Sequence, residues 1–161
     1  MTTPPATMLI ERELLIDARP EIVFRLLTDP VETLKWQGLE VEIDARVGGA
    51  YRCKMNALGH TIRGRYIEVT PPTRVVYSWG WETGMFDIPP ESTIVEITLT
   101  PEGSGTRLHL LHHGLPAEPP IIAASHSMGW ERYLDRLATV AEGRDPGPDE
   151  WATGNMGEAH T

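Results

Sequence analysis

Three features are scarce in this sequence, and each scarcity excludes a class of protein. Cys53 is the single cysteine, so the chain has no disulfide framework of its own. No apolar run approaches the ~18 residues of a membrane-spanning helix. The first residues contain neither a basic nor an apolar segment typical of a secretory signal. We therefore expect a soluble, cytoplasmic protein that does not associate with membranes.

Basic residues are also few. The chain has 14 Lys and Arg against 23 Asp and Glu, which gives a formal net charge of −9. Proteins that bind nucleic acid need a basic surface for the phosphates, so we expect no nucleic-acid partner. Phenylalanine is scarce too, with two residues, whereas five tryptophans are present. The length of 161 residues predicts one domain that can bury a core without further constraints.

Regular hydrophobic patterning covers residues 8–142, which we interpret as the single domain. Residues 1–7 are rich in Thr and Pro and are predicted to be a mobile N-terminus. Residues 143–161 carry Gly, Pro and acidic residues with little apolar pattern, so we predict an irregular acidic tail there. Trp151 is the residue through which this tail could dock on the domain.

The patterning predicts a strand from residue 8, two short helices beginning near Pro20 and Pro30, and a long helix over 120–142. Alternating apolar residues between the helices predict six further strands, near 39–43, 51–55, 61–69, 75–81, 95–99 and 107–112. Short turns between successive strands indicate antiparallel pairing. The predicted fold class is α+β, with a curved antiparallel sheet of about seven strands whose apolar face is covered by the C-terminal helix.

Several ordered segments resemble a known family. They are 47–51 (VGGAY), 64–72 (GRYIEVTPP), 75–79 (VVYSW), 105–108 (GTRL), 112–115 (HHGL), 129–130 (GW) and 134–137 (LDRL). Together they are similar to the START-like helix-grip superfamily (SRPBCC), and more narrowly to the family related to the activator of heat-shock protein 90 ATPase, grouped with polyketide cyclases. The resemblance implies a sheet that wraps around the C-terminal helix, with a cavity between them.

A cavity in such a fold would be lined by inward-facing aromatic and apolar side chains, with a few polar groups that orient a ligand. The candidate ligand-binding residues are Trp36, Tyr51, Met55, Trp79, Trp81, Phe86, His112, His126 and Tyr133. The alternative interpretation is that these residues only pack the core. Met85 and Phe86 lie in a predicted loop over 82–91 and could form a lid.

Histidines are the candidates for catalysis. On a strand, His109 and His113 face one side and His112 faces the other, so only His112 is expected to point inward with Leu108 and Leu110. His112 and His126 would supply at most two metal ligands, whereas zinc sites use three or four, so we predict no metal and no cofactor. Either histidine could instead transfer protons or hydrogen bond to a ligand.

Other charged and small residues have structural interpretations beside functional ones. Glu82, Asp87 and Glu91 form either a solvated loop rim or an acid/base group, and Arg63 and Arg65 form either an exposed face or an anion anchor. Cys53 is expected to face inward as a small apolar residue. We expect Gly64 to permit a close approach within a strand, and Gly129 to let the helix approach the sheet or to leave cavity volume.

The leading hypothesis is a domain that binds a small, largely hydrophobic molecule between the sheet and the C-terminal helix. One alternative is a cyclase/dehydrase-type enzyme that uses the same cavity, with proximity supplying much of the rate. The other is a chaperone-associated or other protein-interaction module, and a homodimer is left open.

Overall fold

The computed structural model describes residues 6–153 and confirms the predicted α+β fold. The elements along the chain are β1 (Thr7–Ile16), α1 (Pro20–Thr28), α2 (Pro30–Thr33), β2 (Glu40–Ile43), β3 (Ala50–Lys54), β4 (Thr61–Thr70), β5 (Arg74–Trp79), the 3-10 helix η1 (Met85–Asp87), β6 (Thr93–Glu102), β7 (Gly105–Pro116) and α3 (Ile121–Ala141). No helix of the described residues has the length and hydropathy to cross a bilayer.

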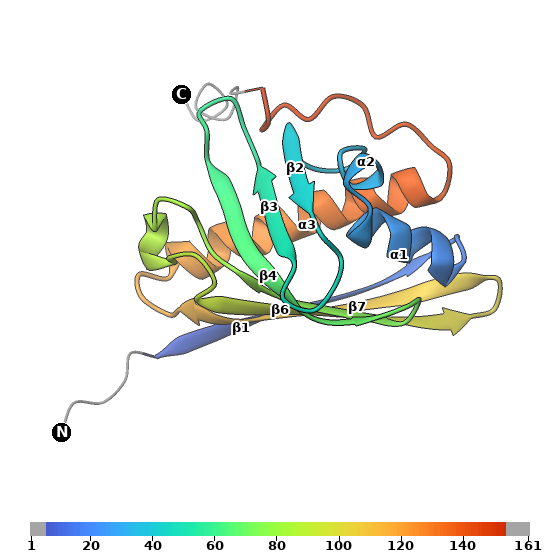
Figure 1. Ribbon diagram of the computed structural model, residues 1–161, viewed down its shortest axis with the longest axis horizontal. Helices are drawn as coiled ribbons and strands as arrows, with labels where there is room; N and C mark the ends of the chain where they lie inside the picture. The colour runs from blue at the N-terminus through green and yellow to red at the C-terminus, as the bar shows by residue number, and fades with distance from the viewer. Residues whose placement is uncertain (1–5, 154–161) are drawn as a thin grey trace.

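All seven strands belong to one antiparallel sheet with the order β1-β7-β6-β5-β4-β3-β2. Figure 1 shows that β2, β3 and β4 rise steeply from the strands β1, β6 and β7, so that the sheet curves around α3. Gly64 lies within β4, and a Cβ there would stand 1.6 Å from the carbonyl oxygen of Ser78 on β5. The expected close approach at Gly64 is therefore confirmed.

Prolines and one aspartate define the two short helices. Proline occupies the first turn of both helices, where its missing N–H removes no hydrogen bond. The Asp29 carboxylate accepts hydrogen bonds from the backbone N–H groups of Val31 and Glu32, which caps α2. Trp36 follows α2 and donates its indole N–H to the Leu26 carbonyl at 2.7 Å. This bond and full burial of the ring join the two helices.

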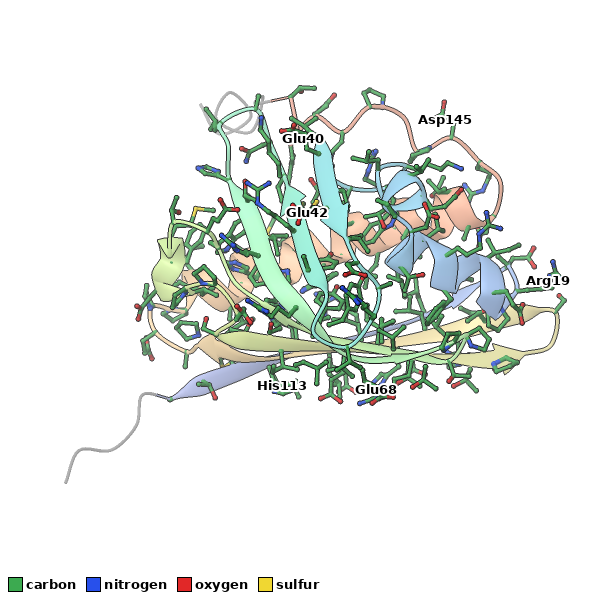
Figure 2. All side chains as sticks on the ribbon, in the orientation of Figure 1. Arg19, Glu40, Glu42, Glu68, His113 and Asp145 are labelled. Atoms are coloured by element: carbon green, nitrogen blue, oxygen red, sulfur yellow. The ribbon has the colours of Figure 1, made fainter. Side chains whose placement is uncertain are left out.

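The two faces of the sheet differ in character. The inner face packs on the buried side of α3, which includes Trp130, Leu134 and Leu137. The outer face carries charged pairs, and Figure 2 shows the side chains of His113 and Glu68 projecting from it, away from α3. As the strand alternation predicted, His109 and His113 face outward and His112 faces inward.

The structure describes part of both ends of the chain. Thr7 is the first residue of β1, and the Ala6 carbonyl accepts a hydrogen bond from the backbone N–H of Ala117. Residues 1–5 and 154–161 lie outside the described part. Residues 144–153, which we call the C-terminal strap, form no helix or strand and run from the end of α3 back toward the turn between β3 and β4 (Figure 1).

Gly129 also differs from one expectation. A Cβ at this position would meet no atom within 4 Å, so the glycine is not needed for a close approach of α3 to the sheet. The space beside it is open.

Candidate functional site

The inward-facing candidates separate into two groups along the sheet. The tryptophan cluster consists of Trp79, Trp81, Phe86, His112 and His126, and lies where the loop after β5 meets the first turns of α3. The tyrosine cluster consists of Tyr51, Tyr66 and Tyr77 on the neighbouring strands β3, β4 and β5. The nine candidates therefore do not line one continuous surface.

Rings of the tryptophan cluster meet edge to face. The Trp79 ring centroid lies 5.2 Å from that of Trp81, 4.7 Å from that of His112 and 5.6 Å from that of His126. Phe86 closes the group at 5.2 Å from His126. Such contacts stabilise aromatic pairs beyond the area that they bury. Trp79 and His112 are fully buried, whereas Phe86 is 45% exposed, so the cluster leads from the core to the surface.

His112 has both ring nitrogens engaged. Its Nδ1 accepts a hydrogen bond from the Trp130 indole at 2.9 Å, which leaves the proton on Nε2, 2.8 Å from the Thr93 hydroxyl. That hydroxyl donates in turn to the Trp79 carbonyl at 2.7 Å. Burial lowers the pKa of His112 to about 3, with smaller contributions from His126 and His113. The imidazole is thus a neutral link between α3 and the sheet.

His126 is held in the same manner but nearer the surface. Its Nδ1 donates to the Ile122 carbonyl at 2.7 Å, and its Nε2 accepts the Trp81 indole N–H at 3.1 Å. Partial burial lowers the pKa of His126 below its ordinary value. Protonation of Nε2 would remove the acceptor of the Trp81 bond. The imidazole therefore holds Trp81 against α3.

The loop between β5 and β6 carries backbone strain. Phe86, Asp87 and Glu91 have φ values of 60°, 59° and 63°, a left-handed conformation that residues other than glycine rarely adopt. Each such residue costs on the order of 1–3 kcal/mol, and such residues concentrate at ligand clamps and switch segments. The strain turns the Phe86 ring toward His126 at the surface.

Tyrosine rings pack closely in the second cluster. Tyr51 stacks on Tyr77 with 4.1 Å between ring centroids, and Tyr66 meets both rings at 5.9 Å. All three side chains are buried, and burial raises the pKa of each hydroxyl. They therefore stay neutral and act only through hydrogen bonds and packing.

The three hydroxyls differ in their partners. Tyr66 donates to the Leu27 carbonyl at 2.8 Å, and Tyr51 accepts from the Gln37 amide at 2.8 Å. The Tyr77 hydroxyl lies beside the Tyr51 hydroxyl, whose proton is directed toward it and affects the pKa of both groups. Sequence reasoning singled out Tyr51 and missed Tyr66, Tyr77 and Gln37. The signal for Tyr77 was its spacing of two from Trp79 on one predicted strand.

Tyr133 lies against the C-terminal strap. The Tyr133 hydroxyl donates to the Asp149 carboxylate at 2.7 Å, and Arg132 pairs with the same carboxylate at 3.0 Å. Trp151 lies 4.9 Å from the Arg132 guanidinium and meets the Tyr133 ring edge to face. The strap is thus docked through Trp151, as the sequence indicated.

Cys53 is buried beneath this part of the chain. Its thiol lies 3.4 Å from the Met55 sulfur and faces inward, as expected. Burial, with a smaller contribution from Asp149, raises the pKa of the Cys53 thiol to about 12. The thiol is therefore protonated and unreactive at neutral pH.

Carboxylates of the loop do not form an acid/base pair. Glu82 binds Arg52 at 2.6 Å, which lowers the pKa of Glu82, and Glu91 pairs with Arg65 at 3.3 Å. Between residues 6 and 153, no three His, Cys, Asp or Glu side chains are grouped to hold a metal ion.

Two hollows lie on the outside of the domain. One, of about 790 Å³, lies between β1, α3 and the strap, and the other, of about 300 Å³, lies on the outer side of β2–β4. No residue of the tryptophan cluster or of the tyrosine cluster lines either hollow.

Comparisons with known proteins agree with this architecture. Residues 17–142 match the family described as Activator of Hsp90 ATPase homolog 1-like protein. No curated protein matches the sequence. An AHSA1-like protein of Rhizobium etli is 42% identical with a TM-score of 0.70, over 90% of this chain and 88% of that one. A Chromobacterium violaceum protein is 32% identical with a TM-score of 0.70, over 88% of this chain and 98% of that one.

A more distant structure shares the fold. The Aha1 dimer of Colwellia psychrerythraea is 21% identical with a TM-score of 0.69, over 84% of this chain and 96% of that one. The family match spans every strand of the sheet after β1 and the whole of α3, and it ends where the C-terminal strap begins. The chain belongs to the Activator of Hsp90 ATPase homolog 1-like family of the SRPBCC helix-grip superfamily.

Proposed function

We propose that the domain binds a small, mostly apolar molecule between the sheet and α3, and that the molecule enters at the tryptophan cluster. The observation that carries this proposal is the continuity of the cluster from the buried Trp79 to the half-exposed Phe86. Binding sites for small molecules are mostly apolar and aromatic with few polar groups. The strained loop that holds Phe86 supplies a movable cover.

The residues have different parts in this proposal. Trp79 and Trp81 supply apolar surface, and Phe86 covers the entrance. His126 orients Trp81 through its hydrogen bond. Movement of the loop 82–91 would separate Phe86 from His126 and open the way to Trp79, because the Phe86 ring lies against His126 and Trp81.

Thermal shift and native mass spectrometry with a panel of lipids, sterols and aromatic polyketides test the proposal. We expect at least one ligand class to raise Tm and to bind at one molecule per chain. Phe86→Ala is expected to weaken that binding several-fold. Leu58→Ala is the matched control, because Leu58 is an exposed apolar residue (73%) in the turn between β3 and β4. Equal losses in both variants, or no binding to the wild type, would contradict the proposal.

The enzymatic alternative has less support. His112 and His126, the candidates for proton transfer, each have both ring nitrogens in hydrogen bonds within the domain. A general base needs a nitrogen that is free to reach its substrate. We therefore assign no reaction to the site.

The homodimer stays a prediction of the sequence. β1 leaves one edge of the sheet unpaired and exposes Leu9 and Leu15, which are 52% and 56% exposed. Glu11 and Glu13 lie on the same face between them, and like charges on facing strands oppose pairing of two such edges. Light scattering after size-exclusion chromatography measures the oligomeric state.

A further inference from the structure

The outer edge of β1 is a row of backbone groups with no strand beside it. β1 stands at the end of the sheet order and pairs only with β7. The turn between β6 and β7 determines which groups face outward, because Glu102 and Gly105 flank a two-residue turn and exchange both hydrogen bonds. Alternation from that pair directs the backbone groups of the even-numbered residues of β1 toward β7, and those of Glu11 and Glu13 toward the free edge.

Few of these outward groups are bonded within the domain. The Asp17 N–H, just beyond β1, donates to the Glu142 carboxylate at 3.0 Å, and the Glu11 carbonyl accepts from the Arg12 guanidinium at 3.2 Å. In the described part of the chain, the N–H groups of Glu11 and Glu13 and the Glu13 carbonyl have no partner. An open edge of this kind can accept an added strand, which supplies the missing hydrogen bonds.

The larger of the two hollows lies beside this edge. It is bounded by Arg12, Glu13 and Leu14 of β1, by one face of α3 and by the C-terminal strap. Because neighbouring residues of a strand point to opposite faces, three consecutive residues line one hollow where the strand presents its edge. Met128 and Trp151 add apolar surface. The hollow, of about 790 Å³, can therefore receive side chains of a strand that pairs with β1.

Charge that is not compensated in this hollow is negative. The arginines that line it are all bonded within the domain, namely Arg12 to Ser127, Arg132 to Asp149 and Arg136 to the carbonyl oxygen of Gly147. Among the described residues, Glu131 lies 4.0 Å from Arg12, and neither Asp135 nor Glu150 has a basic partner. Glu131 and Asp135 stand one turn apart on α3, an arrangement of like charges that destabilises a helix. A cationic partner would remove that repulsion.

We propose that β1 and the larger hollow bind an extended, basic segment of another protein as an added strand. The backbone of the segment bonds to the edge groups of Glu11 and Glu13, and its lysine or arginine side chains reach Glu131 and Asp135 over α3. A second copy of this chain does not fit, because its own β1 would place glutamates against Glu11 and Glu13. The inference is independent of the proposed small-molecule site, because no residue of the tryptophan cluster lines the hollow.

A short peptide of alternating valine and lysine tests the charge, with a control peptide in which glutamate replaces lysine. Fluorescence anisotropy of the labelled peptides measures the dissociation constants at low and at high salt. We expect only the lysine peptide to bind, with an affinity that falls as salt rises. Glu131→Gln with Asp135→Asn should weaken its binding about fivefold. Glu21→Gln with Glu42→Gln is the matched control, because it removes the same charge from exposed residues outside the hollow and should leave binding unchanged.

Proline at position 13 tests the backbone bonds. Glu13→Pro removes an N–H that faces outward and leaves the bonds to β7 in place. We expect this variant to bind the lysine peptide about tenfold or more weakly than the charge-matched Glu13→Gln. In the wild type, binding should slow amide hydrogen exchange at Glu11 and Glu13, a measurement by NMR that needs no substitution.

The outcomes that overturn the inference are distinct. Equal binding of both peptides means that charge does not select the partner, and no binding of the lysine peptide removes the proposed occupant. Unchanged amide exchange at Glu11 and Glu13 in the saturated protein places the peptide elsewhere. Light scattering that shows a dimer, which Glu13→Pro separates into monomers, assigns the edge to a second copy of this chain and contradicts the inference.

Discussion

The two aromatic clusters of the inner face differ in how far their rings lie from solvent. In the tryptophan cluster the rings reach the surface, yet the polar atoms of His112 and His126 all have partners. In the tyrosine cluster the rings are fully buried, and the hydroxyls of Tyr51 and Tyr66 bond to Gln37 and Leu27. The tryptophan cluster therefore offers apolar surface near the solvent, and the tyrosine cluster forms a closed part of the core.

This difference shows that one face of the sheet carries both an aromatic group near the surface and a closed aromatic core. Polar groups near an entrance contact water when the ligand is absent, so they need fixed partners to stay in place. Polar groups in a dry interior bond more strongly to their protein partners, because no water competes for them. Substitutions that remove the hydrogen bonds of the tryptophan cluster should have the largest effect on stability.

The largest expected effect is that of His112→Ala. The substitution leaves the Trp130 indole and the Thr93 hydroxyl with unmet hydrogen bonds and creates a cavity, for an expected loss of about 3–5 kcal/mol in the free energy of unfolding. Urea denaturation measures it. His113→Ala is the control on the next residue, where an exposed pair with Glu96 contributes less than about 1 kcal/mol. Equal losses would show that the His112 links are not structural.

Substitution of Asp149, which anchors the C-terminal strap, should expose the part of the core beside the tyrosine cluster. Asp149→Ala removes the acceptor of Tyr133 and Arg132, charge-assisted bonds whose loss weakens docking by about 1.5–3 kcal/mol. The single cysteine, Cys53, reports on this opening, and we expect its labelling by Ellman's reagent to accelerate about tenfold or more. Phe86→Ala, at the other cluster, should leave the rate unchanged. An equal acceleration in that variant would mean that opening is global.

Lowering the pH affects the stability contributed by His112 and leaves the tyrosine cluster unaffected. The pKa of His112 falls to about 3 in the folded protein, so the unfolded chain binds the extra proton as pH drops below about 6.5. The His112 contribution is thus complete above pH 6.5 and is lost toward pH 3, by at most about 1.4 kcal/mol per pH unit. The tyrosine hydroxyls do not titrate in this range, because burial raises the pKa of each.

Urea unfolding between pH 7 and pH 5 measures this slope. We expect a shallower slope in His112→Gln than in the wild type. The His112 ring protons should show no titration shift by NMR in this range. A ring that titrates near pH 6 would contradict the assignment of His112 as a permanently neutral link.

Patterning in the sequence predicted the architecture because it depends on local periodicity. Alternation placed His112 and Cys53 inward, and prolines marked the starts of both short helices. The division into two clusters was not predictable in this way. It depends on the register between β3, β4 and β5, which brings Tyr51, Tyr66 and Tyr77 together from three separate segments.

Hydrogen-bond partners were equally hidden from sequence reasoning. His112 and His126 were candidates for proton transfer because an inward histidine is compatible with either catalysis or structure. Only the positions of Trp130 and Trp81 decide that both rings are held as acceptors. Similarly, nothing local in the sequence shows that Tyr66 bonds to Leu27 and Tyr51 to Gln37.

The smallest expected effect is that of Gly129→Ala, a substitution on α3 near the tryptophan cluster. Gly129 lies one residue before Trp130, and an added methyl group meets no atom within 4 Å. Because alanine favours a helix over glycine, Gly129→Ala should raise the free energy of unfolding by about 0.5–1 kcal/mol, measured by urea denaturation. If the open space belongs to the ligand site, the same variant weakens binding of the ligand found in the panel while it stabilises the fold. Unchanged binding would place that space outside the site, and the entrance would then be confined to the Trp81 and Phe86 side of the cluster.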